Sequence, residues 1–257
     1  MKEINKIIDV SVWTGHWPFM HLRYGDINVL EDKLKSIRVI KAFIAPIEAI
    51  LEQDPTRANL ALLQKVSGDF FSPVPVIDLS YANWDECMDT VLYDPRVKMI
   101  KLIPNYHQYK MYEKDMDALV EMTRQKEIVI SIQMKVEDPR AQYPLMKVAN
   151  VNNSDVLQTL FSYPEQIFIL HCLTMDSVPG FMTSLDNVYL DIACIERQDT
   201  LSVLQKTYSS LDKFLFASHC PFYFPEGNIN KLKYSDLDIN EIDKVAYKNA
   251  EKLFGIM

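Results

Sequence analysis

Short runs of apolar and β-branched residues alternate along the chain with longer segments whose apolar residues recur at helical spacing. This alternation is typical of repeated β-α units. We predict eight strands, at residues 7–13, 39–45, 70–77, 97–103, 128–134, 167–171, 188–193 and 214–218. Between and after them we predict helices at 28–37, 55–68, 84–92, 113–125, from 153 or 154 onwards, 178–185, 200–211, 241–247 and 249–254.

The order of these elements favours one closed domain. Eight strands in βα order, with no linker rich in glycine, serine or proline, predict a single-domain α/β fold, a (β/α)8 TIM barrel over residues 1–257. A doubly wound open sheet is the alternative, but no Gly-x-Gly-x-x-Gly follows the first strand. Pro73 and Pro75 make the third strand irregular, and residues 137–153 have no clear periodicity.

The amino-acid composition of the chain argues against several classes of function. Hydrophobic residues make up 48% of the chain and the net charge is -8, which argues against nucleic-acid binding because that requires a basic surface. No apolar run reaches the roughly 18 residues of a membrane helix. The first residues lack a signal-peptide apolar region, so we expect a cytoplasmic protein. The four cysteines show no Cys-x-x-Cys spacing and are expected to be free thiols. Whether the protein forms a homo-oligomer is left open.

In a (β/α)8 barrel the chemistry takes place where the strands end, because the strand tips and the following loops share one mouth. Polar residues and one tryptophan stand at six predicted strand ends. They are Asp9, Ser11 and Trp13 on the first; Lys101, Asn105 and His107 at the fourth; Ser131, Gln133, Glu137, Asp138 and Arg140 around the fifth; His171 on the sixth; Asp191 and Glu196 around the seventh; and Ser218 and His219 on the eighth.

Two histidines and a lysine stand out among these residues. His171 and His219 each close an apolar run. A single histidine there could cap a strand through a loop carbonyl, but two on different strands favour a functional site. Lys101 lies inside a strand that is otherwise apolar, so its side chain either extends to the surface or points into the barrel. We favour the inward orientation, with Asp9 as its partner.

Two predicted loops also attract attention. Aromatic residues gather in the loop after the first strand and around His107, where ordinary packing is the default and a lid that excludes water is the alternative. The segment 137–140 fits a solvated turn. Its Arg140 could instead clamp a substrate carboxylate or phosphate at the barrel mouth.

Several segments together resemble the amidohydrolase-related TIM-barrel family, and they span essentially the whole chain. They are Asp9 on the first strand, residues 100–106 on the fourth, His171 on the sixth, residues 216–219 on the eighth and residues 249–255 at the end. The resemblance implies a barrel that carries out metal-assisted hydrolysis or decarboxylation of small cyclic or acyl substrates.

The chain departs from the family at the positions of the metal ligands. Ser11 and Trp13 replace the two histidines of the first strand, Gln133 replaces the histidine of the fifth, and His219 replaces the aspartate of the eighth. Of the family's ligands only His171 is retained. The departures predict a centre with no cofactor, in which Trp13 fills the metal's space or stacks on substrate. A divalent metal held by rearranged ligands is left open.

These observations favour a metal-independent hydrolase of a small, anionic lactone, ester or amide. His171 or His219 would act as general base and the other as acid, while Lys101 and Arg140 would stabilise negative charge. The remaining residues expected to contact substrate are Asp9, Ser11, Trp13, Gln133 and His107. The alternatives are a non-catalytic ligand-binding barrel and a metallohydrolase with rearranged ligands.

Overall fold

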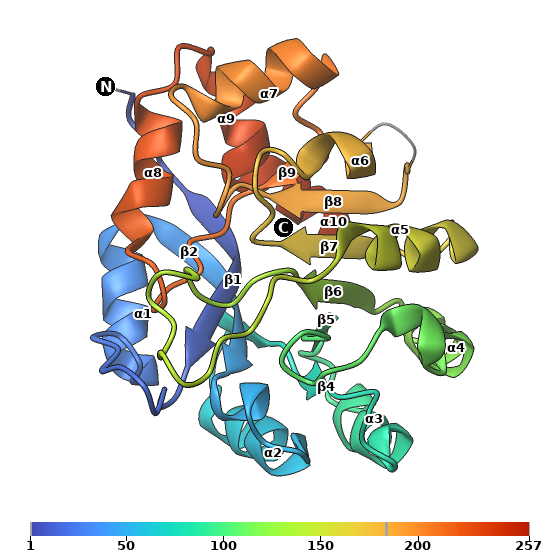
Figure 1. The fold of residues 1–257 in the computed structure, drawn as a ribbon. Helices are drawn as coiled ribbons and strands as arrows, with labels where there is room; N and C mark the ends of the chain where they lie inside the picture. The colour runs from blue at the N-terminus through green and yellow to red at the C-terminus, as the bar shows by residue number, and fades with distance from the viewer. Residues whose placement is uncertain (1, 183–184, 257) are drawn as a thin grey trace.

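The computed structural model of the chain describes residues 2–182 and 185–256, and its parallel strands form the centre of the molecule (Figure 1). Two hydrogen-bonded runs succeed one another, in the order β1-β2-β3 and then β4-β5-β6-β7-β8-β9. The strands are β1 (Ile7–Thr14), β2 (Val39–Pro46), β3 (Phe71–Pro73), β4 (Val76–Ile77), β5 (Met99–Leu102), β6 (Val129–Gln133), β7 (Phe168–His171), β8 (Val188–Asp191) and β9 (Phe214–Leu215).

Strands β3 and β4 are two halves of the one strand predicted at 70–77. They are separated at Val74-Pro75, where proline has no N–H for the ladder. Each side of the break still pairs with its neighbour, because Val74 N donates to Ile44 O at 2.8 Å and Lys101 N donates to Pro75 O at 2.8 Å. The two runs of strands are therefore continuous through this position.

The ring is closed between β1 and the segment that follows β9. Val10 N donates to Phe216 O at 3.0 Å, and His219 N donates to Ser11 O at 3.0 Å. The first and last strands are thus neighbours, as a barrel requires. The predicted single-domain (β/α)8 TIM barrel is confirmed.

Helices surround this ring of strands (Figure 1). They are α1 (Ile27–Ser36), α2 (Thr56–Lys65), α3 (Trp84–Leu92), α4 (Met116–Arg124), α5 (Asn153–Ser162), α6 (Val178–Met182), α7 (Thr200–Tyr208), α8 (Pro225–Lys233), α9 (Ile239–Asp243) and α10 (Asn249–Phe254). Short turns of 3-10 helix lie at Glu48–Ile50 and Met111–Glu113, and a π-helical turn at Lys244–Lys248 joins α9 to α10. The predicted helix at 178–185 includes residues 183 and 184, which lie outside the described residues.

The sequence analysis missed helix α8. This helix has Pro225 at its first turn and buries few apolar side chains, chiefly Ile229 and Leu232, so its apolar periodicity is weak. The predicted start of α5 at residue 153 is confirmed, and the side chain of Asn152 caps this helix. Residues 137–152 form turns and irregular chain, as the lack of periodicity indicated.

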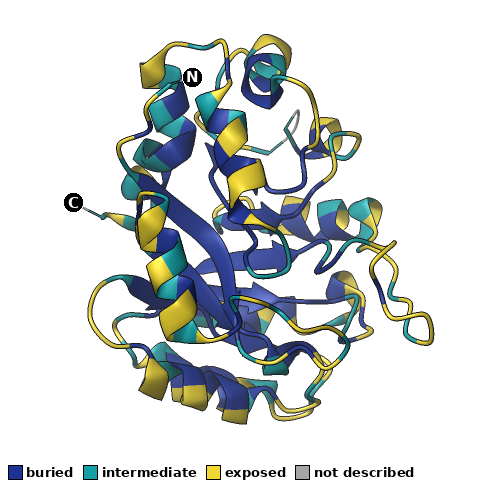
Figure 2. Cartoon of the chain, turned by 90° about the vertical axis from the view of Figure 1, so that its left-hand side faces the viewer, coloured by how far each residue is buried: buried dark blue, intermediate teal, exposed yellow. Residues whose placement is uncertain are grey.

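Alternate residues of the strands face into the barrel, where they form a core distinct from the one beneath the helices. Met99, Val129 and Ile169 belong to this inner core, together with Leu215. In Figure 2 the strands are mostly buried; the exceptions are Ile40 and Lys41 in β2 and Tyr189 in β8. Side chains two residues further along, at Lys101, Ser131 and His171, therefore also point inward, and they lie towards the C-terminal ends of their strands.

Two further features concern the chain as a whole. All four cysteines, Cys87, Cys172, Cys194 and Cys220, are free and buried, as expected. Across residues 2–182 and 185–256 the helices are too short or too polar to cross a lipid bilayer.

Candidate functional site

A layer of buried polar side chains closes the C-terminal end of the barrel core. Six of its members are no more than 1% exposed; five come from five different strands and the sixth, His219, from the segment after β9: Asp9, Lys101, Gln133, His171, Asp191 and His219. Polar groups are rarely buried this completely unless they are paired, so each requires a partner or a function.

His171 and Asp191 form the central pair of this layer. His171 Nδ1 lies 2.7 Å from Asp191 Oδ2, and both side chains are fully buried. Burial and the charge of Lys101 together lower the pKa of His171 to about 4, although the hydrogen bond and charge of Asp191 act in the opposite direction. The ring is therefore neutral at neutral pH, with its proton on Nδ1 facing the carboxylate. His171 Nε2 is buried without a hydrogen-bond partner, which makes it a free acceptor inside the barrel.

Asp191 is held in place from its own strand and from the next. It accepts hydrogen bonds from Ala193 N at 2.9 Å and from Cys172 N at 3.2 Å. Burial alone would raise its pKa, but the hydrogen bond to His171 and these backbone donors keep that pKa below its usual value. Asp191 belongs to this buried layer but was not selected from the sequence as a site residue. Its position at the end of the seventh strand was noted, and only its pairing with His171 was missing.

Lys101 points into the barrel, as the sequence analysis favoured. Its Nζ donates to Ser11 Oγ at 3.1 Å and to Gln133 Oε1 at 3.0 Å. It also lies 4.6 Å from the centre of the Trp13 ring, within the range of a cation–π interaction. Burial lowers the pKa of Lys101 to about 7, against the opposing effect of nearby acidic groups.

Asp9 was predicted to be the partner of Lys101, and the hydrogen bonding shows otherwise. Asp9 Oδ1 accepts from Ser11 N at 3.2 Å and Ser218 N at 3.0 Å, so this carboxyl group joins the first and last strands. Its Oδ2 is buried without a partner. Burial raises the pKa of Asp9 to about 7, and Asp191 adds to the rise.

The raised pKa of Asp9 predicts a specific pH dependence. Between its ordinary pKa of 3.8 and about 7, folded Asp9 keeps a proton that the unfolded chain loses. The contribution of protonated Asp9 to the free energy of unfolding is complete below pH 3.8. It decreases as the pH rises and is lost once the pH has passed about 7. We expect wild type to lose about 1.4 kcal/mol of unfolding free energy per pH unit relative to Asp9→Asn over this window. Urea denaturation of both proteins from acid to neutral pH measures the difference, and a flat difference would show that the pKa is not raised.

His219 has both ring nitrogens occupied. Its Nδ1 accepts from Trp13 Nε1 at 3.2 Å, and its Nε2 lies 2.5 Å from Val136 O. Burial lowers the pKa of His219 to about 3, and the hydrogen bond to Val136 O opposes this. The neutral ring therefore connects the first strand to the loop after β6, and of the two strand-end histidines only His171 has a free nitrogen.

Aromatic side chains from several loops cover this layer. Trp17 packs edge-on against Phe222 with ring centres 5.4 Å apart, and against Tyr106 at 6.1 Å. Phe222 in turn packs on Trp13 at 6.0 Å. Trp17 is only 1% exposed, so the rings form a closed cover over the polar layer. The aromatic loops thus pack on one another in the position expected of a lid.

Two residues predicted for the site lie apart from this layer. Arg140 pairs with Asp138 at 2.7 Å and its side chain is 91% exposed, so it is not positioned to clamp a ligand at the centre. His107 Nε2 lies 3.0 Å from Ala49 O, and its Nδ1 lies 3.7 Å from Asp78. It borders a surface cavity of about 470 Å³.

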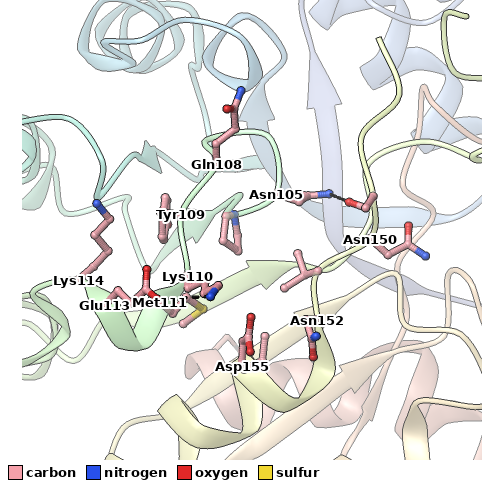
Figure 3. A pocket seen from close by; sticks show the side chains of 14 residues that line it. Asn105, Gln108, Tyr109, Lys110, Met111, Glu113, Lys114, Asn150, Asn152 and Asp155 are labelled. Atoms are coloured by element: carbon pink, nitrogen blue, oxygen red, sulfur yellow. Dashed lines mark hydrogen bonds and ion pairs between the residues drawn. The ribbon is translucent and has the colours of Figure 1, made fainter.

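Figure 3 shows a neighbouring cavity of about 390 Å³, between the loop after β5 and the start of α5. Asn105, Lys110 and Glu113 line one side, and Asn152 and Asp155 line the other. None of the six buried polar residues listed for the barrel centre lines it. It is a surface hollow beside the barrel rather than an entrance to the polar layer.

The fold is similar to those of several solved structures. Over 98% of this chain and 99% of the other, the structure matches 2,6-dihydroxybenzoate decarboxylase from Rhizobium with a TM-score of 0.71 at 12% identity. It matches dihydroxybenzoic acid decarboxylase from Polaromonas, which contains manganese and 2-nitroresorcinol, over 98% of both chains with a TM-score of 0.67 at 14% identity. It also matches an uncharacterised TIM-barrel protein from Bordetella bronchiseptica over 97% of this chain and 98% of the other, with a TM-score of 0.71 at 13% identity.

The sequence itself matches no family model and no curated protein. At identities this low, the structural comparisons establish the fold alone, a TIM barrel that the chain shares with these decarboxylases. The predicted resemblance to that group is confirmed at the level of the fold.

The residues at the centre do not fit the metal ion that such barrels imply. A zinc or related site needs three or four nitrogen, oxygen or sulfur ligands. Ser11 and Gln133 are bound to Lys101, Trp13 provides no ligand atom, and both nitrogens of His219 are occupied. Within the described part of the chain, no group of three or more His, Cys, Asp or Glu residues is arranged to hold a metal.

Proposed function

We propose that the chain is an enzyme that hydrolyses a small anionic lactone, ester or amide without a metal ion. The observation that carries the proposal is the buried pair of His171 and Asp191, in which the carboxylate fixes the tautomer and leaves Nε2 free as a base. Lys101 supplies a positive charge beside it. Two structural neighbours are named for dihydroxybenzoates, which are small anions, and this supports the substrate class.

The arrangement supports a simple hydrolytic sequence. His171 Nε2 takes a proton from water, and the hydroxide adds to the substrate carbonyl carbon. Lys101 has a third N–H bond beyond those to Ser11 and Gln133, and it stabilises the resulting oxyanion. The intermediate then collapses, and the leaving alkoxide or amine takes the proton from the His171 imidazolium. The net reaction converts substrate and water into an acid and an alcohol or amine.

In this proposal the other predicted residues have supporting functions. Asp9 joins the first and last strands beneath the site, and His219 positions Trp13 through a hydrogen bond. The aromatic cover excludes water once substrate is bound, and it must open for substrate to enter.

A non-catalytic ligand-binding barrel is the second candidate. The closed aromatic cover favours it, because Trp17 and the polar layer below have almost no exposure to solvent. Such a protein would bind small anions in the same centre and leave them unchanged.

A substrate screen separates the two candidates. Wild type is incubated with lactones, esters, amides and hydroxybenzoates, with and without a strong chelator, and products are identified by mass spectrometry. The proposal expects a hydrolysis product that forms equally well with chelator and is lost in His171→Gln, with Arg140→Ala as the active control. Ligands that shift the melting temperature but are never converted would establish the binding protein. Release of carbon dioxide would replace hydrolysis by decarboxylation.

A further inference from the structure

The residues that contact Lys101 are the ones that stand at family metal-ligand positions. By the resemblance to the amidohydrolase-related family, Ser11 and Trp13 stand where that family has two first-strand histidines, and Gln133 stands where it has a fifth-strand histidine. In the structure Lys101 Nζ lies 3.1 Å from Ser11 Oγ, 3.0 Å from Gln133 Oε1 and 4.6 Å from the Trp13 ring centre. Three separate departures from the family thus converge on one ammonium group.

Each of these side chains suits an ammonium better than a metal. A hydroxyl oxygen and an amide oxygen accept N–H bonds without adding charge, and an indole face attracts a cation without ligating it. The three replacements and the lysine are therefore matched to one another.

The two remaining ligand positions, His171 and His219, are largely occupied by other contacts. His171 Nδ1 is engaged by Asp191, and both nitrogens of His219 are occupied. Among the six buried polar residues of this layer, all within the described part of the chain, only His171 Nε2 and Asp9 Oδ2 are buried without a hydrogen-bond partner, and a dication at these two atoms would be repelled by the ammonium.

From these contacts we infer that Lys101 replaces the metal ion of amidohydrolase-related barrels, providing a built-in cation that also excludes divalent metals from the centre. The inference does not require the proposed hydrolysis, because it concerns the charge that the centre presents to any bound anion. Since the pKa of Lys101 is lowered to about 7, its side chain carries the full charge only below neutral pH, and chelators cannot remove that charge. The function of this centre should therefore be independent of metal supply.

Metal titration of matched variants tests the inference. We would purify wild type, Ser11→His, and Ser11→His combined with Lys101→Met, and confirm by circular dichroism that each is folded. The added histidine joins His171 and Asp9 to give three ligands, and methionine preserves the length of the lysine side chain without its charge. Binding of Mn²⁺ and Co²⁺ is followed by calorimetry and by Co²⁺ absorption.

We expect wild type to take up no stoichiometric metal and to melt at the same temperature with and without chelator. The double variant should bind Co²⁺ roughly tenfold or more tightly than Ser11→His alone, because the repelling charge is gone. Stoichiometric metal in wild type would overturn the inference. So would equal behaviour of the two variants, whether both bind or neither does.

A second pair of variants tests the inference without any change at position 11, so that local misfolding there cannot affect the result. Lys101→Met and Lys101→Arg are compared for binding of benzoate, a small anion that serves as probe. The inference expects binding by wild type and by the arginine variant, and a loss of roughly tenfold or more in the methionine variant. Unchanged benzoate affinity in Lys101→Met would show that Lys101 is not the cation of this centre.

Discussion

Replacing Asp191 by asparagine is expected to reverse the tautomer of His171 and to reduce turnover by about 10²- to 10⁴-fold. The carboxylate accepts the Nδ1 proton across 2.7 Å in a fully buried pair. An asparagine amide that turns its N–H groups toward Nδ1 would favour the proton on Nε2, and the free base of the proposed site would then be lost.

Nitrogen NMR of histidine measures the tautomer without any substrate. The His171 spectrum should change from the Nδ1–H form in wild type to the Nε2–H form in Asp191→Asn, while His107 serves as an internal reference. Glutamate at position 191 keeps the charge and should restore part of the wild-type signal. An unchanged tautomer in Asp191→Asn would show that the carboxylate does not orient the ring.

Replacing Trp13 by alanine is expected to lower the free energy of unfolding by about 3–5 kcal/mol, the usual cost of truncating a fully buried tryptophan. The Trp13 ring packs on Phe222 and lies beneath the Lys101 ammonium, while its Nε1 donates to His219. Alanine would leave a cavity at the centre and remove one partner each from two buried polar side chains.

Trp13→Phe is the matched control, since it keeps an aromatic ring and loses the Nε1 donor. We expect a smaller loss of about 1–3 kcal/mol, the cost of leaving one buried polar atom unsatisfied. Urea denaturation measures the free energy of unfolding of each variant, with one common value for its dependence on urea concentration. Equal losses in both variants would mean that the hydrogen bond to His219, and not the packing of the ring, accounts for the effect.

The fold could be predicted from the sequence because its signals are local. Each strand is a short apolar run between longer amphipathic segments, and the order of the runs alone defines repeated β-α units. Pro73 and Pro75 showed where a strand would be irregular, and the structure divides that strand into β3 and β4. Helix α8 was missed because it buries few apolar residues and so has little periodicity to detect.

The inward orientation of Lys101 could also be predicted, since a strand alternates its faces and the neighbours of this lysine are apolar. The hydrogen-bond partners of Lys101 could not be predicted. Which side chain reaches the ammonium depends on the register between β5, β6 and β1, and the sequence does not specify register. Asp9 looked suitable by charge, yet its carboxyl group accepts the N–H groups of Ser11 and Ser218.

The roles of the histidines and of Arg140 could not be predicted either, because they also depend on contacts that the sequence does not specify. His171 and His219 look alike in the sequence, since each ends an apolar run, and only the structure shows which ring has a free nitrogen. Arg140 was expected at the mouth because it follows a strand end. It pairs instead with Asp138, two residues earlier, in an exposed turn. Local pairing of this kind is easily overlooked when an arginine is considered alone.

The central claim is that a lysine, and not a metal ion, provides the positive charge at the centre of this barrel. A crystal structure of protein grown with excess Mn²⁺, with data collected at the manganese absorption edge, tests it most directly. The account predicts continuous density for Lys101 up to an Nζ atom between Ser11 and Gln133, and no anomalous peak beside His171. An anomalous peak bound to His171 Nε2, with Lys101 displaced, would contradict it.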